Sequence, residues 1–340
     1  YLTDSAKITS EFSKEDVVGG TTNVTTPQIV INEYGITISP EGFDIWGVVD
    51  ATEQQSLVTT TTDIFGSSST TQTINEEYSF QYGIPVATKI KTIVTGINIF
   101  GLDSRQETVA TQTYALVTKE GRKAYLMQSS STRTVDNSST DVFGNKTSLA
   151  QGSILNINYG KLIDANGNTI WGVMSAVESQ PLIVRGEDIF GNISTTSTRN
   201  TFQAVNGQLI TVETNSDTIV TDALGNRTTS TTKSANHYKW EDDVYVLDYV
   251  DTITSSSGSD LYGGTWSSDG YKIIKRYSWN ELKEAYTFMY EDQNGAQYNP
   301  FQDGAQFNVI TTGTGTDIFG NLSTTTTTVT FEIKSGQLVT

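Results

Sequence analysis

The side chains that commonly carry enzyme chemistry are scarce in this 340-residue sequence. It contains no cysteine and a single histidine, His237, so thiolate chemistry and most histidine-based catalytic pairs are excluded. There is no Gly-x-Ser-x-Gly turn, no phosphate-binding loop and no histidine-rich metal spacing. Paired carboxylates could still hydrolyse glycosides, but the acidic residues are scattered and duplicated modules do not single out one site. The sequence therefore predicts a protein that is not an enzyme and uses no cofactor.

Oxygen-bearing side chains make calcium the one metal to consider. The segments Asp164–Asn168 and Asp292–Gly295 resemble the start of a calcium loop, yet both lack the downstream glutamate that completes one. The acidic segment Glu241–Asp243 is typical of a solvated turn. His237 lies between polar and aromatic neighbours, as an ordinary strand residue does. We therefore expect turns and strands at these places, and no metal site.

Composition and charge narrow the choice of partners. The net charge is −17, with 21 basic residues, which opposes binding to the phosphates of DNA or RNA. No apolar run approaches the length of a membrane-spanning helix. Threonine and serine make up about a quarter of the chain, which favours strands. An acidic, cysteine-free sequence that begins at Tyr1 predicts an exported protein, extracellular or at the cell surface.

One tetrad recurs along the chain with the pattern Asp-apolar-aromatic-Gly. The four closest copies run from Asp63 to Gly66, Asp141 to Gly144, Asp188 to Gly191 and Asp317 to Gly320. Looser copies begin at Asp16, Asn98, Asp222 and Asp260. Aspartate suits the first position of a type I turn and glycine suits the fourth. The pattern predicts a chain reversal at each tetrad.

The tetrads belong to a longer repeat of about 125 residues. The segment Tyr34–Leu57 recurs as Tyr159–Leu182, with Trp46 matching Trp171. Phe202 and the following Gly207–Leu209 recur as Phe331 and Gly336–Leu338. Tandem duplication therefore predicts a leading strand in residues 1–15, a first module in 16–140, a second in 141–259 and a partial third in 260–340.

A second family of turns lies between successive tetrads. We place these turns near Gly42, Gly83, Gly121, Gly167, Gly207, Gly295 and Gly336, and at Glu241–Asp243. Asn-Gly pairs at 166–167, 206–207 and 294–295 are typical of two-residue hairpin turns. Two alternating turn families predict an all-β fold, a tandem-repeat antiparallel meander of about 17 long strands arranged as a strip, sandwich or solenoid-like stack. A short helix near Trp279–Tyr290 remains an alternative, because Ser278 and Glu281 resemble a capping box.

The tetrad followed by asparagine, as in Asp222–Thr228, resembles the turn of YD-repeat (Rhs-type) proteins. These secreted chains wind long β-hairpin strips into hollow shells. Threonine, glutamate or serine stands here where that family has tyrosine before the aspartate. The resemblance covers only the turns, and it implies a hairpin strip without assigning any functional residue.

The central residues of the tetrads are apolar, although hairpin turns are usually polar. One interpretation is that each ring folds back to cap its own sheet. The other is that the turns pack on one another or on a neighbouring subunit. The candidate interface residues are Phe65, Phe100, Phe143, Phe190, Leu224, Tyr262 and Phe319.

These observations predict a structural, self-assembling subunit of an extracellular filament, sheath or surface layer. We expect a homo-oligomer or polymer that grows head to tail by strand pairing. A first alternative is an adhesin or stalk that binds surface glycans through Trp46, Trp171 and nearby tyrosines. A second alternative is an outer-membrane β-barrel, although Thr324–Thr328 cannot supply a lipid-facing band.

Overall fold

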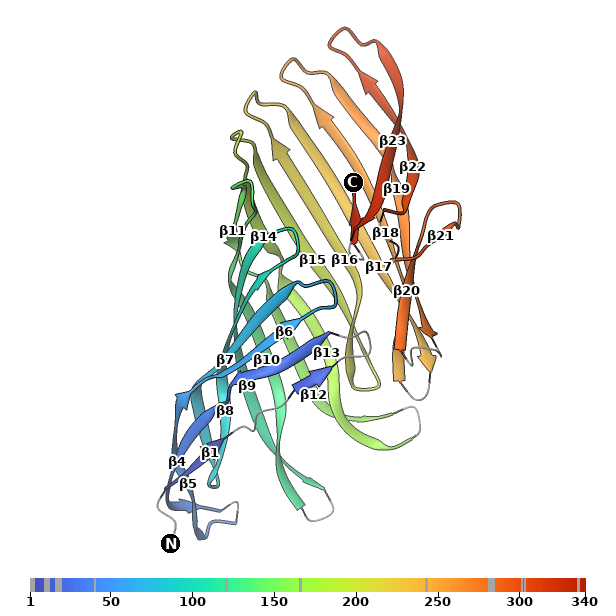
Figure 1. Ribbon diagram of the computed structural model, residues 1–340. Helices are drawn as coiled ribbons and strands as arrows, with labels where there is room; N and C mark the ends of the chain where they lie inside the picture. The colour runs from blue at the N-terminus through green and yellow to red at the C-terminus, as the bar shows by residue number, and fades with distance from the viewer. Residues whose placement is uncertain are drawn as a thin grey trace. The chain divides into compact units, whose positions relative to one another are not determined.

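The computed structural model contains only strands as regular elements (Figure 1). It describes residues 4–8, 13–15, 20–39, 41–119, 122–164, 167–241, 244–280, 285–300, 302, 304–334 and 337–340. Every strand pairing recorded within these ranges is antiparallel. The predicted all-β antiparallel meander is therefore confirmed. The described residues include no helix, and hence none capable of crossing a membrane.

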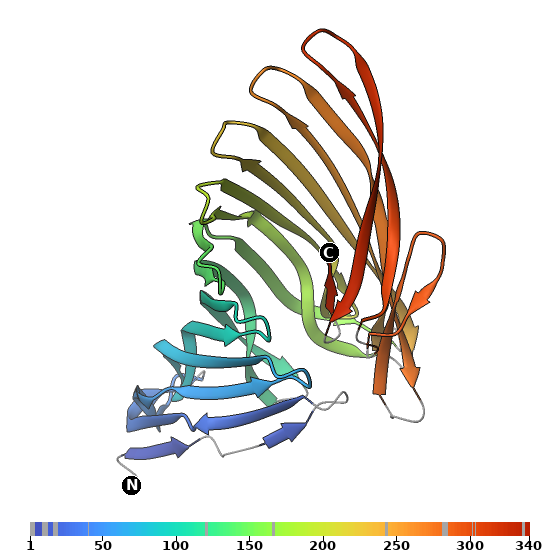
Figure 2. The same ribbon diagram turned by 45° about the horizontal axis from the view of Figure 1, so that its top comes forward.

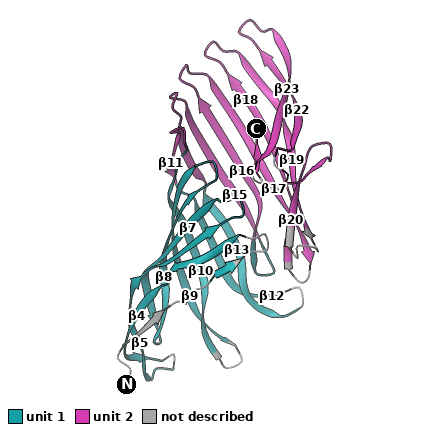
Figure 3. Cartoon of the chain, viewed as in Figure 1, with its two compact units in different colours: residues 1–141, 152–180, 204–209 teal, residues 142–151, 181–203, 210–340 magenta. Residues whose placement is uncertain are grey.

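The chain divides into two compact units (Figure 3). The first comprises residues 1–141, 152–180 and 204–209, and the second comprises 142–151, 181–203 and 210–340. Strands of the first unit are β1 Asp4–Ile8, β2 Ser13–Glu15, β3 Thr21–Thr26, β4 Ile29–Ile38, β5 Asp44–Gln55, β6 Leu57–Thr62, β7 Ser68–Gln81, β8 Ile84–Ile97, β9 Asp103–Lys119, β10 Arg122–Thr140, β12 Ile154–Ile163 and β13 Thr169–Gln180.

The second unit also consists of strands. They are β11 Lys146–Gln151, β14 Leu182–Glu187, β15 Ile193–Val205, β16 Gln208–Thr221, β17 Arg227–Glu241, β18 Val244–Ser259, β19 Thr265–Asn280, β20 Ala285–Glu291, β21 Gln297–Tyr298, β22 Gln306–Thr316, β23 Leu322–Lys334 and β24 Gln337–Val339. The tip of hairpin β15–β16, residues 204–209, belongs to the first unit. The helix considered near Trp279–Tyr290 is absent from its described residues, which lie in β19 and β20.

The meander is interrupted by hairpins that leave it. In the first unit β3 pairs with β6, so the intervening hairpin β4–β5 lies outside the row β2-β3-β6-β7-β8-β9-β10. Together with β1 it forms a separate three-stranded sheet. β11 and β14 of the second unit pair directly, so hairpin β12–β13, which belongs to the first unit, lies outside their row. We call β4–β5 and β12–β13 the excursion hairpins.

Sequence repeats and structural repeats coincide at the excursion hairpins. Asp4 of β1 lies opposite Glu33 of β4, and Ser129 of β10 lies opposite Asn158 of β12. Both members of the second pair follow those of the first by about 125 residues, which is the length of the sequence repeat. The alternating turns of the sequence predict these hairpins inside the meander. The structure shows that they branch from it.

Each excursion hairpin docks on a neighbouring turn through two glycines. Gly172 lies against Gly207, and a Cβ atom on Gly172 would stand 2.6 Å from the Gly207 Cα. The adjacent Val173 N–H donates to the Gly207 carbonyl at 2.8 Å. Gly47 and Gly83 repeat this contact in the other hairpin. Only glycine on both sides permits such a backbone approach, which explains why the repeat keeps both residues.

Hydroxyl pairs join neighbouring strands of the second unit. Thr196 and Thr218 connect β15 to β16 at 2.9 Å, and Ser234 and Thr252 connect β17 to β18 at 3.0 Å. Apolar packing is concentrated elsewhere, in a cluster of Phe307, Val309 and Phe331 with neighbouring tyrosines. The rings of Phe307 and Phe331 stack at 5.3 Å. Threonine-rich strands thus rely on ladder and hydroxyl hydrogen bonds where the apolar core is thin.

Candidate assembly edge of the tetrad turns

Each tetrad turn is organised by the carboxylate of its first residue. Asp188 Oδ1 accepts the N–H groups of Phe190 and Asn192, both at 2.9 Å. The Gly191 N–H donates to the Asp188 carbonyl at 3.1 Å, and Gly191 has φ 81°. This is a type I turn completed by a left-handed glycine. The Asn192 N–H, with help from the Phe190 N–H, lowers the pKa of Asp188 below its usual value.

The same hydrogen bonds recur at other tetrads. The aspartate carbonyl accepts the glycine N–H in the turns that begin at Asp63, Asp222, Asp260 and Asp317. In the Asp141 turn, Gly144 has φ 91°. Turn hydrogen bonds also lower the pKa values of Asp222 and Asp317, with the side-chain amides of Asn226 and Asn321 as the largest causes. The first copy, Asp16–Gly19, lies outside the described residues.

Two turns predicted as two-residue Asn-Gly hairpins have the tetrad geometry instead. Gly295 donates to the Asp292 carbonyl at 3.0 Å, and Asp292 Oδ1 accepts the N–H groups of Asn294 and Ala296. Gly167 donates to the Asp164 carbonyl in the same way. In both turns an aspartate precedes the Asn-Gly pair by two residues and accepts the N–H groups of the turn, which favours the tetrad geometry. At Asn206 and Gly207, where no such aspartate precedes, both residues have positive φ, as predicted.

The apolar side chains at the tips of the second unit are exposed to solvent. Phe190 is 76% exposed, Tyr262 78% and Phe319 82%, and Phe143 and Leu224 are exposed to a similar extent. These side chains do not fold back to cap the sheet. Phe100 of the first unit is 43% exposed and Phe65 is half-buried. The tetrad turns that join β16 to β17, β18 to β19 and β22 to β23 lie at the same, upper end of the strands (Figure 1, Figure 2), so the exposed tips follow one edge.

Asparagine side chains connect successive turns along this edge. Asn145 Oδ1 accepts the N–H of Ile189 at 3.1 Å, in the next tetrad. Asn192 accepts from Ala223, and Asn226 accepts from Leu261, each at 3.0 Å. We call these contacts the asparagine bridges. They fix the spacing of the apolar tips, a role that the sequence pattern alone does not indicate.

The bridges stop at the turn of Asp260, where Gly264 takes the place of the asparagine. The last tetrad again has an asparagine, Asn321, whose amide donates to Asp317 Oδ2 at 2.7 Å. Its Oδ1 accepts no hydrogen bond from another described residue. The final turn therefore carries a bridge acceptor that remains available.

The other candidate residues have structural partners. Trp171 Nε1 donates to the Met127 carbonyl at 2.9 Å, whereas Trp46 is 43% exposed. His237 stacks on Tyr249 with ring centroids 4.1 Å apart, and its Nε2 lies 3.5 Å from Asp251 Oδ2. Within the described ranges no three acidic or histidine side chains gather as metal ligands. Gly121, Asp242, Asp243 and Gly336, expected at turns, lie outside the described residues.

No protein-family model, curated protein or solved structure matches the chain. Function must therefore be inferred from its own geometry.

Proposed function

We propose that the protein is a non-enzymatic structural subunit that self-assembles outside the cell or on its surface into a filament, sheath or layer. The observation that carries the proposal is the row of exposed apolar tips on the second unit. Contiguous exposed apolar side chains on a soluble protein mark interaction surfaces. The asparagine bridges fix the backbone of the turns that carry Phe190, Leu224 and Tyr262, so little backbone entropy is lost when a partner covers these side chains.

A strand edge supports growth by a second type of contact. β23 pairs with β22 along Leu322–Glu332, but with β24 only through Glu332–Lys334. Over residues 322–331 its other edge has no partner within the described part of the chain. An unpaired edge rich in threonine accepts another strand readily. We infer that head-to-tail strand pairing uses this edge, while the tips make lateral contacts between neighbouring subunits.

The tips can be tested without disturbing the fold. We expect the triple variant Phe190→Ser, Tyr262→Ser and Phe319→Ser to assemble at a protein concentration at least about tenfold higher than the wild type. Burial of three large side chains between subunits would be lost, while their exposure in the monomer predicts an unchanged melting temperature. Electron microscopy and sedimentation measure assembly, and circular dichroism measures melting.

A variant of the unpaired β23 edge distinguishes head-to-tail strand pairing from the lateral contacts of the tips. Thr326→Lys with Thr328→Lys places charges on β23, which should shorten the assemblies while leaving lateral contacts intact. Wild-type protein that stays monomeric at millimolar concentration would overturn the proposed function. Normal assembly of the triple variant would show that the tips are not its contact surface.

A further inference from the structure

One strand row of the second unit departs from the repeat. Trp266 of β19 lies between Gly258 of β18 and Gly315 of β22. The equivalent positions, six residues after the first aspartate of the other modules, are Thr22 and Thr147. Thr22 bonds the Thr61 hydroxyl of the neighbouring strand at 3.0 Å, an ordinary hydroxyl pair. The third module alone has an aromatic side chain here.

Glycine accompanies this tryptophan for a steric reason. A Cβ on Gly258 would stand 2.6 Å from Cε2 of the Trp266 indole, so any larger residue would displace the ring. The equivalents of Gly258 in the other modules are Lys14 and Ser139. Glycine weakens a strand interior and often marks a place where a ligand approaches closely. Trp266 itself is 42% exposed, so much of its surface is open.

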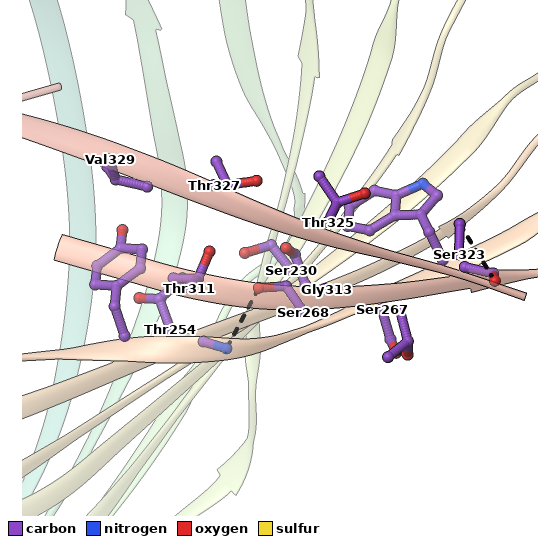
Figure 4. Close-up of a pocket in the computed structure, with 16 residues that line it drawn as sticks. Ser230, Thr254, Ser267, Ser268, Thr311, Gly313, Ser323, Thr325, Thr327 and Val329 are labelled. Carbon is purple, nitrogen blue, oxygen red and sulfur yellow. Dashed lines mark hydrogen bonds between the residues drawn. The ribbon is translucent and has the colours of Figure 1, made fainter.

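The indole borders a groove lined by hydroxyl groups (Figure 4). Its volume is about 550 Å³, within the range of small-molecule sites. Strands β17, β18, β19, β22 and β23 supply the lining, and none of the sixteen lining residues is charged. The labelled serine and threonine side chains come from all five strands.

Several of these hydroxyl groups have no hydrogen-bond partner among the described residues. Thr311 is only 6% exposed, yet its hydroxyl makes no hydrogen bond to another described residue. Ser256, Thr325 and Thr327 also line the groove without a side-chain hydrogen bond in the described structure. These four hydroxyls can therefore donate to or accept from a ligand in the groove.

We propose that this groove binds a short neutral carbohydrate chain, with one sugar ring stacked on Trp266. The C–H face of a pyranose is apolar and fits a flat indole, whereas its hydroxyls project sideways toward serine and threonine partners. The uncharged lining and the net charge of −17 disfavour an anionic ligand. This site is independent of the turn edge, and it adds glycan attachment to the proposed structural role.

The test is a titration with four neutral oligosaccharides, namely cellohexaose, chitohexaose, maltohexaose and mannohexaose. Isothermal calorimetry of the whole chain should detect saturable binding of at least one of them. Trp266→Thr restores the residue of the other modules and should weaken that binding at least about tenfold. Trp240→Thr is the matched control, because Trp240 is equally exposed but lies outside the groove.

A second variant does not alter the tryptophan. Thr325→Val with Thr327→Val removes two hydroxyls from an exposed stretch of β23 while preserving strand propensity, and should also weaken binding. Failure of the wild type to bind any of the four sugars would overturn the proposal. Unchanged affinity in both the Trp266 and the threonine variants would overturn it equally. Assembly is measured separately, so either proposal can fail alone.

Discussion

At the scale of the residue, one carboxylate organises each tetrad turn. Asp317 Oδ1 accepts the N–H groups of Phe319 and Asn321 at 2.8 Å, while Oδ2 accepts the Asn321 amide. The side chain thereby fixes the backbone that presents Phe319 to solvent. The aspartate and the apolar residue two positions later therefore act together, because the hydrogen bonds of the aspartate set the direction of the apolar side chain.

Replacing Asp317 should loosen this turn without unfolding the sheet. In Asp317→Ala the N–H groups of Phe319 and Asn321 lose their acceptor, so their hydrogen exchange should accelerate while amides in the middle of β22 keep their rates. Asp269→Ala removes the same charge from an exposed strand position and serves as the control. Equal exchange at Phe319 in the two variants would contradict the role assigned to Asp317.

The pH dependence of the same exchange has a definite sign. The pKa of Asp317 is lowered in the folded turn, chiefly by the Asn321 amide. The stabilisation by the carboxylate is therefore complete above the ordinary aspartate pKa of the unfolded chain, and is lost as the pH falls through the lowered value. In the wild type, protection of the Phe319 N–H from hydrogen exchange should fall as the pH drops through the lowered pKa of Asp317. The Asp317→Ala variant should show no such transition.

At the scale of the element, the excursion hairpins depend on contacts between glycines. Gly172 and Gly160 lie opposite each other in hairpin β12–β13, yet they face different neighbours. A Cβ on Gly172 would meet the backbone of Gly207, which cannot move alone. A Cβ on Gly160 would meet the thioether of Met174, which can rotate away.

These two glycines form a matched pair for mutagenesis. Gly172→Ala should lower the free energy of unfolding by about 1–3 kcal/mol, the usual range for an overpacked contact. Gly160→Ala should cost clearly less, because a flexible side chain yields. Chemical denaturation measures both values. A larger loss for Gly160→Ala would contradict docking through Gly172 and Gly207.

The elements also show what the sequence can and cannot predict. The strands and tetrad turns were predictable because their signals are local: Asp and Gly three residues apart, and β-branched residues between turns. The departure of β4–β5 from the meander was not, because the pairing of β3 with β6 joins segments separated by a whole hairpin. The asparagine bridges were missed for the same reason. Asn192 and Ala223 are distant in sequence, and no pattern in the residues around either one predicts their hydrogen bond.

At the scale of the whole molecule, charge opposes the association that we propose. The net charge of −17 makes copies of the chain repel one another, while the exposed tips attract. The balance between these forces must depend on ionic strength. Surface charges separated by more than a Debye length of about 10 Å are screened at 0.1 M salt.

Assembly should therefore begin at lower protein concentration as sodium chloride is raised. Light scattering across a salt series measures this onset, and the triple tip variant provides the control, because it lacks the attraction that screening would reveal. An onset that rises with salt would indicate that charge pairs, rather than apolar tips, join the subunits.

The end of the asparagine bridges at Gly264 has a mechanical consequence. Beyond it, the ladder hydrogen bonds between β19 and β22 are confined to Thr265–Ser268 against Gly313–Thr316, whereas β17 and β18 pair along nearly their whole length. A subunit of the proposed filament or layer would carry tension, and force applied across the strands concentrates where the fewest hydrogen bonds share it. Among the pairings that join β17, β18, β19, β22 and β23 this seam is the shortest, so we expect rupture to begin there, which would release β22 and β23 as a hairpin while the bridged strands stay joined. Such a yielding hairpin would lengthen the molecule under load and dissipate energy before the remaining sheet fails.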